Sequence, residues 1–490
     1  MKSKLNILHV SPEVVPFAKS GGLADVVGSL PEALASLGHE VRVFLPFYRM
    51  IKEGGFKIRR TVSQIDVPVG ERSEGGVLLE ADYDQGVTVY FLQHDAYFDR
   101  AHLYGTPQGD YEDNAERFIF FCRSLLKVLK ALDLRPDIIH CHDWQTGLIP
   151  VYLKTLWEDE PLLSSTSCCY TIHNIAYQGL FAEKVMPMTG LPRKVFTTDG
   201  MEFWEKVNFM KAGINYSDVI TTVSPKYSQE IQTPEYGYGL EGVLKNRRGH
   251  LYGVLNGIDT NEWDPERDEH LKANYSIHDL SGKERCKEDL LKSFNMNESA
   301  VTAPLLGLIS RLADQKGFDL LAQIMDELMA MDLGFVLLGT GDQMYQDMFK
   351  KIARKYPRKM GIKIGFDNAL AHRIEAGCDM FLMPSRYEPC GLNQMYSLRY
   401  GTIPIVRATG GLDDTVEQYD PTTGKGNGFK FMLYSPAELL DKIREAVDLY
   451  KDKDAWRHLM RNGMQAHFSW AQSAKKYGQI YEKALNLHYA

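Results

Sequence analysis

The chain has 490 residues, of which 44% are hydrophobic and 24% charged, and its formal net charge is −8. This length predicts at least two domains with separate cores. The mild acidity argues against general binding to nucleic acids or membrane surfaces, because both require a basic surface. No hydrophobic run approaches the roughly 20 residues of a membrane span, and a strand predicted near the start leaves no room for a leader peptide. We therefore expect a cytoplasmic protein.

The N-terminal half alternates short apolar runs, typical of strands, with helical patterns. Strands are predicted at residues 5–11, 40–45, 87–92, 137–141, 167–172 and 218–223. Helices are predicted at 114–132 and 144–157, and a further one begins at Gly22 or Leu23 and restarts at Pro31. The polar stretch 97–113 is too long for an idle connection and is predicted to be a binding loop or lid.

The alternation breaks over the polar residues 256–280 and then resumes. Strands are predicted at 304–310, 334–338, 361–365, 379–383 and 403–407, with helices at 317–331, 343–356, 368–376 and 391–400. A last helix over 469–487 has Ser469 as its predicted N-cap. The fold class is therefore α/β with two doubly wound domains, divided as 1–256, 257–468 and a closing segment 469–490. Ligands bind beyond the carboxyl ends of such strands, so a shared cleft is expected.

The seven cysteines are odd in number and include no Cys-x-x-Cys pair. This pattern predicts neither a disulfide framework nor a zinc site.

The segment between the first predicted strand and the next predicted helix contains a lysine and two adjacent glycines, Lys19, Gly21 and Gly22. Glycines at a helix start cost stability, so a close approach of backbone N–H groups to an anion is one explanation. A tight turn with a solvated lysine is the other, and the stretch alone does not separate them.

The second half places Arg311 at the end of a predicted strand and Lys316 at the start of the next helix. A planar guanidinium and a point charge near a helix N-terminus suit a diphosphate, although alone such residues are more often solvated. Gly339 and Gly341 are similar to a dinucleotide fingerprint, but Met344 replaces its third glycine, so a tight turn is the better interpretation.

Polar clusters follow three other predicted strands, at 140–144, 171–174 and 384–392. Each cluster places polar side chains at the carboxyl edge of a sheet, where a ligand of the cleft is expected. Any one of them has a structural explanation, but their convergence on one predicted cleft favours a functional site.

Together these motifs closely resemble those of the bacterial glycogen synthases and plant starch synthases. The motifs are Lys19-Ser-Gly-Gly-Leu23, His142-Asp-Trp144, Ile172-His-Asn174, Asn256-Gly-Ile-Asp259, Arg311-x4-Lys316-Gly317, Glu388-Pro-Cys-Gly-Leu392 and Thr409-Gly-Gly-Leu412. The resemblance runs in order from residue 5 to beyond 470. It implies two Rossmann-like domains facing across a cleft (the GT-B fold), with the last helix crossing back to the N-terminal domain. It also implies retaining transfer of glucose from ADP-glucose to the 4-OH at the non-reducing end of an α-1,4-glucan.

The resemblance also implies roles for individual residues. Residues assigned to donor binding are Lys19, Gly21, Gly22, Asp25, Asn256, Arg311, Lys316, Phe366, Cys390, Gly391 and Leu392. Residues assigned to catalysis are Glu388, Lys316, Arg311, His173 and Asp143, and those assigned to the acceptor are Tyr97, Asp143 and Trp144. Fixed cations and helix ends would stabilise the departing diphosphate, so no metal and no cofactor are expected. The oligomeric state is left open.

Two positions depart from the family's pattern. Phe366 stands where relatives have tyrosine, which keeps stacking on adenine but loses a hydroxyl contact. Tyr396 stands eight residues after Glu388, where broader retaining families often have a second glutamate. The alternatives left open are a related glucosyltransferase using UDP-glucose or another acceptor, and a glucan-binding protein without catalysis; an oxidoreductase is disfavoured by the failed fingerprint.

Overall fold

A computed structural model describes residues 4–106, 108–297 and 301–488. The chain divides into two compact units, Met1–Gly257 together with Trp470–Ala490, and Ile258–Ser469. Within the described residues, no helix is both long and apolar enough to cross a membrane.

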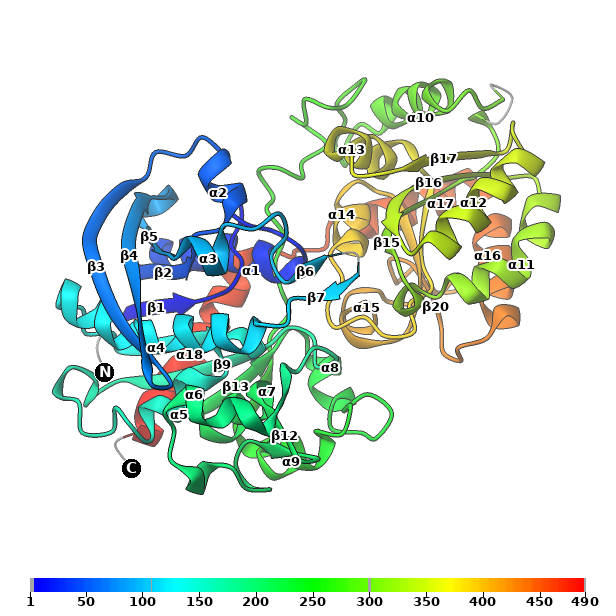
Figure 1. Cartoon of the computed structure of the whole chain (residues 1–490). Coiled ribbons are helices and arrows are strands. Elements are labelled where there is room, and N and C mark those ends of the chain that lie inside the picture. The colour runs from blue at the N-terminus through cyan, green and yellow to red at the C-terminus, as the bar shows by residue number, and fades with distance from the viewer. Residues whose placement is uncertain (1–3, 107, 298–300, 489–490) are drawn as a thin grey trace. The chain divides into compact units, whose positions relative to one another are not determined.

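The first unit is built on a nine-stranded sheet in the order β14-β13-β9-β8-β1-β2-β5-β4-β3 (Figure 1). Its strands are β1 (Asn6–Val10), β2 (Glu40–Pro46), β3 (Arg59–Val69), β4 (Arg72–Asp82), β5 (Thr88–Gln93), β8 (Ile138–His142), β9 (Ser167–Ile172), β13 (Val219–Thr222) and β14 (Leu251–Gly253). All neighbours pair in parallel except β3 with β4 and β4 with β5. The buried apolar runs dictate the parallel part, since both faces are covered.

Helices and short strands complete this unit. They are α1 (Gly22–Ser36), α2 (Arg49–Glu53), α3 (Asp95–Phe98), α4 (Asn114–Leu132), α5 (Leu148–Leu153), α6 (Met186–Thr189), α7 (Phe209–Tyr216), α8 (Pro225–Glu230), α9 (Glu241–Asn246), β6 (Gly105–Thr106), β7 (Gly109–Asp110), β10 (Leu180–Ala182), β11 (Glu202–Phe203) and β12 (Lys206–Asn208). The last helix, α18 (Trp470–His488), packs on α1 and also contacts β9 (Figure 1, red).

The second unit has a six-stranded parallel sheet in the order β17-β16-β15-β18-β19-β20. Its strands are β15 (Leu305–Leu312), β16 (Gly334–Gly341), β17 (Met360–Ile364), β18 (Met380–Met383), β19 (Ile403–Arg407) and β20 (Phe429–Phe431). Its helices are α10 (Ser281–Ser293), α11 (Phe318–Ala330), α12 (Gln343–Lys355), α13 (Asn368–Gly377), α14 (Asn393–Arg399), α15 (Gly410–Thr415), α16 (Pro436–Tyr450) and α17 (Lys453–Met464). The strand order 3-2-1-4-5-6 is that of a doubly wound Rossmann sheet, so the α/β prediction is confirmed.

Two local predictions are wrong, and one pair of strands was missed. Helix α1 runs without a break through the buried Pro31 instead of restarting there. The helix expected over 144–157 is a 3-10 turn, Trp144–Thr146, followed by the short α5. The antiparallel pair β3 and β4 was not predicted, because the first half of β3 is exposed on both faces and so lacks the alternation that marks a half-buried strand.

Candidate active site

Four of the candidate residues follow the strands at which each sheet reverses its winding. In the first unit the loops after the adjacent strands β1 and β8 carry Lys19 and Asp143. In the second unit the adjacent strands β15 and β18 lead to Lys316 and Glu388. The carboxyl ends of strands on either side of such a point form the usual ligand site of a doubly wound sheet.

The loop before α1 is organised by a carboxylate. Glu13 accepts hydrogen bonds from the Ser20 N–H, from the Ser20 hydroxyl at 2.6 Å, from the Gly21 N–H at 3.2 Å and from the Tyr104 hydroxyl at 2.6 Å. Lys19 extends to the surface, where its Nζ lies 2.6 Å from Asp25 in the first turn of the helix. The side chain of Glu13 therefore accepts hydrogen bonds from two successive amides of this loop.

The glycines of this loop are not required by packing. A Cβ built on Gly21 or Gly22 meets nothing within 4 Å, and Gly21 has an extended backbone that any residue adopts. The second unit differs, since a Cβ on Gly410 or Gly411 would lie 1.9 and 2.1 Å from the carbonyl oxygens of Glu388 and Cys390. The open space beside Gly21 and Gly22 favours a ligand over a tight turn as the reason for glycine there.

Asp143 is held in an unusual conformation directly after β8. Its backbone φ of 55° and ψ of −175° lie in a region that residues other than glycine rarely adopt. Its carboxyl accepts a hydrogen bond of 2.7 Å from the backbone N–H of His173. Burial raises the pKa of Asp143 to about 8, against the opposing effect of the His173 and Asn174 amides. Asp143 thus has a strained backbone. Its carboxyl group also favours the neutral form.

The raised pKa predicts a pH dependence of stability. Between about pH 4 and pH 8 the folded chain keeps a proton on Asp143 that the unfolded chain has lost, so this group makes folding less favourable as pH rises through that window. Its contribution is at most about 1.4 kcal/mol per pH unit. Asp143→Asn should remove it: in urea unfolding at pH 5 and pH 8 the wild type loses more stability than the variant. Equal losses would contradict the shifted pKa.

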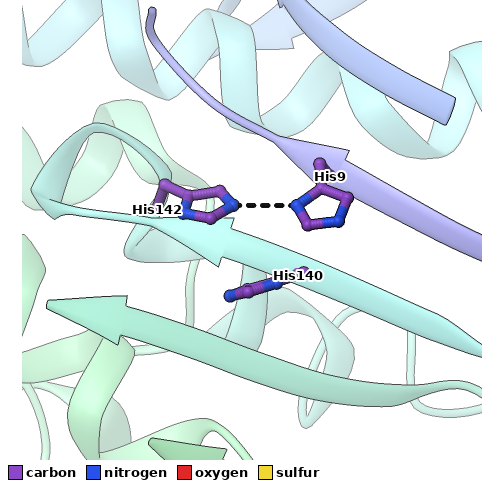
Figure 2. A group of neighbouring side chains, drawn as sticks. All are labelled: His9, His140 and His142. Atoms are coloured by element: carbon purple, nitrogen blue, oxygen red, sulfur yellow. Dashed lines mark hydrogen bonds between the residues drawn. The ribbon is translucent and has the colours of Figure 1, made fainter. Parts of the chain in front are cut away.

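Three buried histidines lie on one face of the first sheet, His9 on β1 and His140 and His142 on β8 (Figure 2). One possible ligand atom from each ring lies within 4.8 Å of the others. However, His140 is hydrogen-bonded through one nitrogen to the Tyr481 hydroxyl at 2.8 Å and through the other to Thr171 at 2.6 Å. Both nitrogens of His142 are also engaged, with His9 and His173. This bonding describes a hydrogen-bonded core rather than a set of free metal ligands.

The aromatic residues expected at the acceptor are built into the body of the first unit. Trp144 is half-buried against Phe118 and Phe181, and Gly179 leaves room for its ring. Tyr97 in α3 is only 6% exposed; its ring stacks on His94 and its hydroxyl donates to Glu116. Only an edge of Tyr97 is thus available to a ligand.

The fully buried Arg117 in α4 forms hydrogen bonds to the segment that the sequence predicts to be a binding loop or lid, 97–113. Its guanidinium donates to the carbonyl oxygens of Tyr97 at 2.7 Å and Leu103 at 2.9 Å. Asn114 donates to the Tyr104 carbonyl at 2.8 Å. These bonds fix the first part of the segment, residues 97–104.

Asn256, at the end of the first unit, carries a buried acceptor without a partner. Its side chain is 6% exposed, and its Oδ1 receives no hydrogen bond from any described residue. A buried polar atom of this kind is costly unless a ligand satisfies it.

In the second unit Lys316 and Glu388 form a close ion pair. Lys316 Nζ lies 2.6 Å from Glu388 Oε2, which also accepts a 3.0 Å hydrogen bond from the Ser385 hydroxyl. Glu388 is 6% exposed. Arg311 near the end of β15 is exposed, and no ion pair of its guanidinium is seen within the ranges that the structure describes. At the ends of β15 and β18 the described residues therefore include the Lys316–Glu388 ion pair and the exposed guanidinium of Arg311.

The chain after Glu388 is fixed by close backbone contacts. Gly391 has a φ of +70°, and Leu392 precedes the first turn of α14. The Gly411 N–H donates to the Glu388 carbonyl at 3.2 Å. All seven cysteines, Cys390 included, are buried, and none of them forms a disulfide with another described cysteine.

Phe366 and Tyr396 have very different surroundings. Phe366 is 86% exposed after Gly365, at the end of β17. Tyr396 in α14 stacks on Trp263 with 3.9 Å between ring centroids, and Trp263 stacks in turn on His372 at 3.8 Å. The ring at position 396 therefore packs α14 against the loop after residue 258, within the second unit.

Glu13, Tyr104 and His9 belong to the environment of the site but were not predicted. Glu13 follows the first strand by three residues, which is the signal that could have identified it. Tyr104 and His9 gave no comparable signal, because their partners are distant in sequence.

Comparisons with known proteins match the whole chain. The family model "Starch synthase catalytic domain" matches residues 6–246, and "Glycosyl transferases group 1" matches 292–462. A glycogen synthase of Koribacter versatilis is 51% identical over 480 residues, covering 98% of both chains. One of Moorella thermoacetica is 49% identical over 488 residues, covering 99% of this chain and 98% of the relative.

Solved structures agree. The catalytic domain of starch synthase IV from Arabidopsis thaliana, bound to ADP and acarbose, superposes with a TM-score of 0.91 at 34% identity, covering 99% of this chain and all of that one. Sucrose-phosphate synthase from Thermosynechococcus elongatus has a TM-score of 0.60 at 16% identity over 98% of both chains, which shows the fold alone.

Proposed function

The chain belongs to the glycogen and starch synthase family, and from this membership we propose which of its residues carry out the steps of the reaction. The fold is GT-B, and the reaction is the transfer of glucose from ADP-glucose to an α-1,4-glucan, EC 2.4.1.21. The observation that carries the residue assignment is the Lys316–Glu388 pair, 2.6 Å apart at the switch point of the second sheet.

The cationic residues act on the diphosphate. Arg311 offers a planar guanidinium that forms no ion pair with another described residue. Lys316, five residues later, offers a point charge. Lys19 and the amides of Gly21 and Gly22 act on the same donor, with Asp25 holding Lys19 in place. Charge grows on the diphosphate as its bond to glucose breaks, so fixed cations that meet it there accelerate the step. Phe366, nearly fully exposed, stacks on the adenine.

The transferred glucose is bound by groups that can form further hydrogen bonds. The unpartnered Oδ1 of Asn256 accepts a hydrogen bond from a sugar hydroxyl. Glu388 orients the glucosyl hydroxyls and faces the electron-poor ring, while the backbone of Cys390, Gly391 and Leu392 forms a cradle for the same hydroxyls. The backbone of His173 contributes a further contact.

The acceptor end of the glucan lies against Asp143 and Trp144, and an edge of the Tyr97 ring also contacts it. The 4-OH oxygen of the acceptor attacks the anomeric carbon on the face from which the diphosphate departs, which retains the configuration. One bond forms, the bond to the phosphate oxygen breaks, and the acceptor's proton passes to the leaving phosphate. We also assign the enzyme to the cytoplasm, where cysteines that form no disulfides are usual.

Gly21→Ala tests the donor loop. The new Cβ meets no atom, so urea unfolding should match that of the wild type. If diphosphate approaches the amides closely, the KM for ADP-glucose should rise by about tenfold, equivalent to about 1.4 kcal/mol. Gly28→Ala is the matched control: its Cβ would lie 2.9 Å from the Val15 carbonyl, so it should lower stability instead. An unchanged KM in a folded Gly21→Ala protein would remove this loop from the donor site.

The reaction itself is tested with maltoheptaose blocked at either end. Reducing-end-blocked chains should be lengthened by ADP-glucose, and chains blocked at the non-reducing 4-OH should not. A preference for UDP-glucose would replace the donor in this proposal, and binding of glucan without turnover would replace the reaction.

A further inference from the structure

The rings of three histidines in the first unit form a continuous chain, and the assignment above uses only the backbone of one of them, His173. His9 Nδ1 lies 3.0 Å from His142 Nε2, and His142 Nδ1 lies 3.0 Å from His173 Nε2. Figure 2 shows the first of these contacts, between neighbouring strands. His9 and His142 are fully buried, whereas His173 keeps 8% of its surface exposed at the carboxyl end of β9.

The chain permits only two arrangements of protons. Burial lowers the pKa of His9 and His173 to about 3, and that of His142 well below its usual value, so each ring is neutral and carries one proton. Each nitrogen–nitrogen contact needs one proton between its two atoms. Since His142 has a single N–H, both contacts must run in the same direction. The third proton then lies on His9 Nε2 or on His173 Nδ1.

The two ends of the chain differ. His9 Nε2 is buried and has no partner among the described residues. Buried N–H groups without an acceptor are rare in proteins, rarer than under-satisfied acceptors. The arrangement that avoids one places the third proton on His173 Nδ1, at the partly exposed end.

We propose that His9 and His142 are positioning residues that hold His173 in the Nδ1–H tautomer, so that its ring presents a donor toward a hydroxyl oxygen of the bound sugar. The part that concerns the sugar rests on the proposed function; the tautomer does not. Asp143 holds the backbone of the same residue through the His173 N–H. Ring and backbone of His173 are thus fixed from two directions, one by a histidine chain and one by a carboxyl group.

The test uses the full-length protein labelled with ¹⁵N-histidine. Ring nitrogen chemical shifts should show His9, His142 and His173 protonated at Nδ1, the minor tautomer of free histidine. Signals are assigned from His→Asn variants. Protonation of His173 at Nε2 in the wild type would overturn the proposal whether or not the enzyme is active.

Variants separate positioning from packing. His142→Leu should release His173 to the Nε2–H tautomer and lower kcat at least tenfold, with the KM for ADP-glucose changed less than threefold. His142→Asn, whose amide can donate to His173 Nε2, should restore the tautomer and most of kcat. His140→Leu is the matched control, equally buried two residues away but bonded to Tyr481 and Thr171, and should leave the tautomer of His173 unchanged. Loss of kcat in His142→Leu with an unchanged tautomer would contradict the proposal, as would failure of His142→Asn to restore it.

Discussion

Glu388→Gln should lower kcat by roughly 10³-fold while the protein folds normally, as expected when a charged group that stabilises a transition state is neutralised. In the proposed role the side chain of Glu388 faces the sugar from which the diphosphate departs, and glutamine keeps its size but cannot carry its charge. The Ser385 hydrogen bond can persist to the amide oxygen, whereas Lys316 loses its ionic partner. Steady-state kinetics with ADP-glucose and glycogen, beside urea unfolding, measure both effects.

Glu375→Gln is the control for burial of a neutralised carboxyl. Glu375 is fully buried in the same unit and bonds to Ser397, and burial raises its pKa to about 8, so glutamine resembles its neutral form. It should leave kcat within about twofold, in keeping with an isosteric change away from the reacting atoms. Near-wild-type turnover of Glu388→Gln would end the assignment of Glu388.

Lys316→Met should raise the KM for ADP-glucose and also lower kcat, by roughly 10²-fold. The reason is its proposed role, in which the lysine binds the diphosphate in the ground state and more strongly as charge grows on it. Methionine keeps the apolar stem, so the packing loss is small. It leaves the buried Glu388 without its cation, so a fall in stability is also expected.

Lys442→Met is the control for loss of an ion pair. Lys442 lies 2.6 Å from Glu445, and its side chain is 26% exposed against 21% for Lys316. It should change neither kinetic constant. Donor kinetics of Lys316→Met equal to those of Lys442→Met would remove Lys316 from the donor site.

Much of the fold could be predicted because local patterns and buried faces agree. The predicted helix 114–132 is α4, and the five strands expected in the second half are β15 to β19 to within a few residues. Patterns failed where burial did not follow them. Helix α10 has a mostly polar sequence and only a narrow apolar side, with Leu290 and Leu291 buried, and no helix was predicted there.

The site was predictable only in part. Motif resemblance assigned Lys316 and Glu388 to the site, an assignment that stays a prediction. It did not predict that they form an ion pair, because their contact spans 72 residues. The two pairs of adjacent glycines also show that the sequence does not reveal contacts between distant residues. Gly21-Gly22 and Gly410-Gly411 look alike in sequence, yet only the second pair is required by close backbone contact. The histidine chain joins residues 133 and 31 positions apart, beyond the reach of any local pattern.

The central claim is that fixed protein groups, without an added metal, drive glucose transfer from ADP-glucose to a glucan. The most direct measurement is ADP release from ADP-glucose in the presence of EDTA, with and without glycogen. We predict release that depends on glycogen, equals glucose incorporated, and is unchanged by EDTA. Release that EDTA abolishes and Mg²⁺ restores, or release that does not depend on glycogen, would contradict the account.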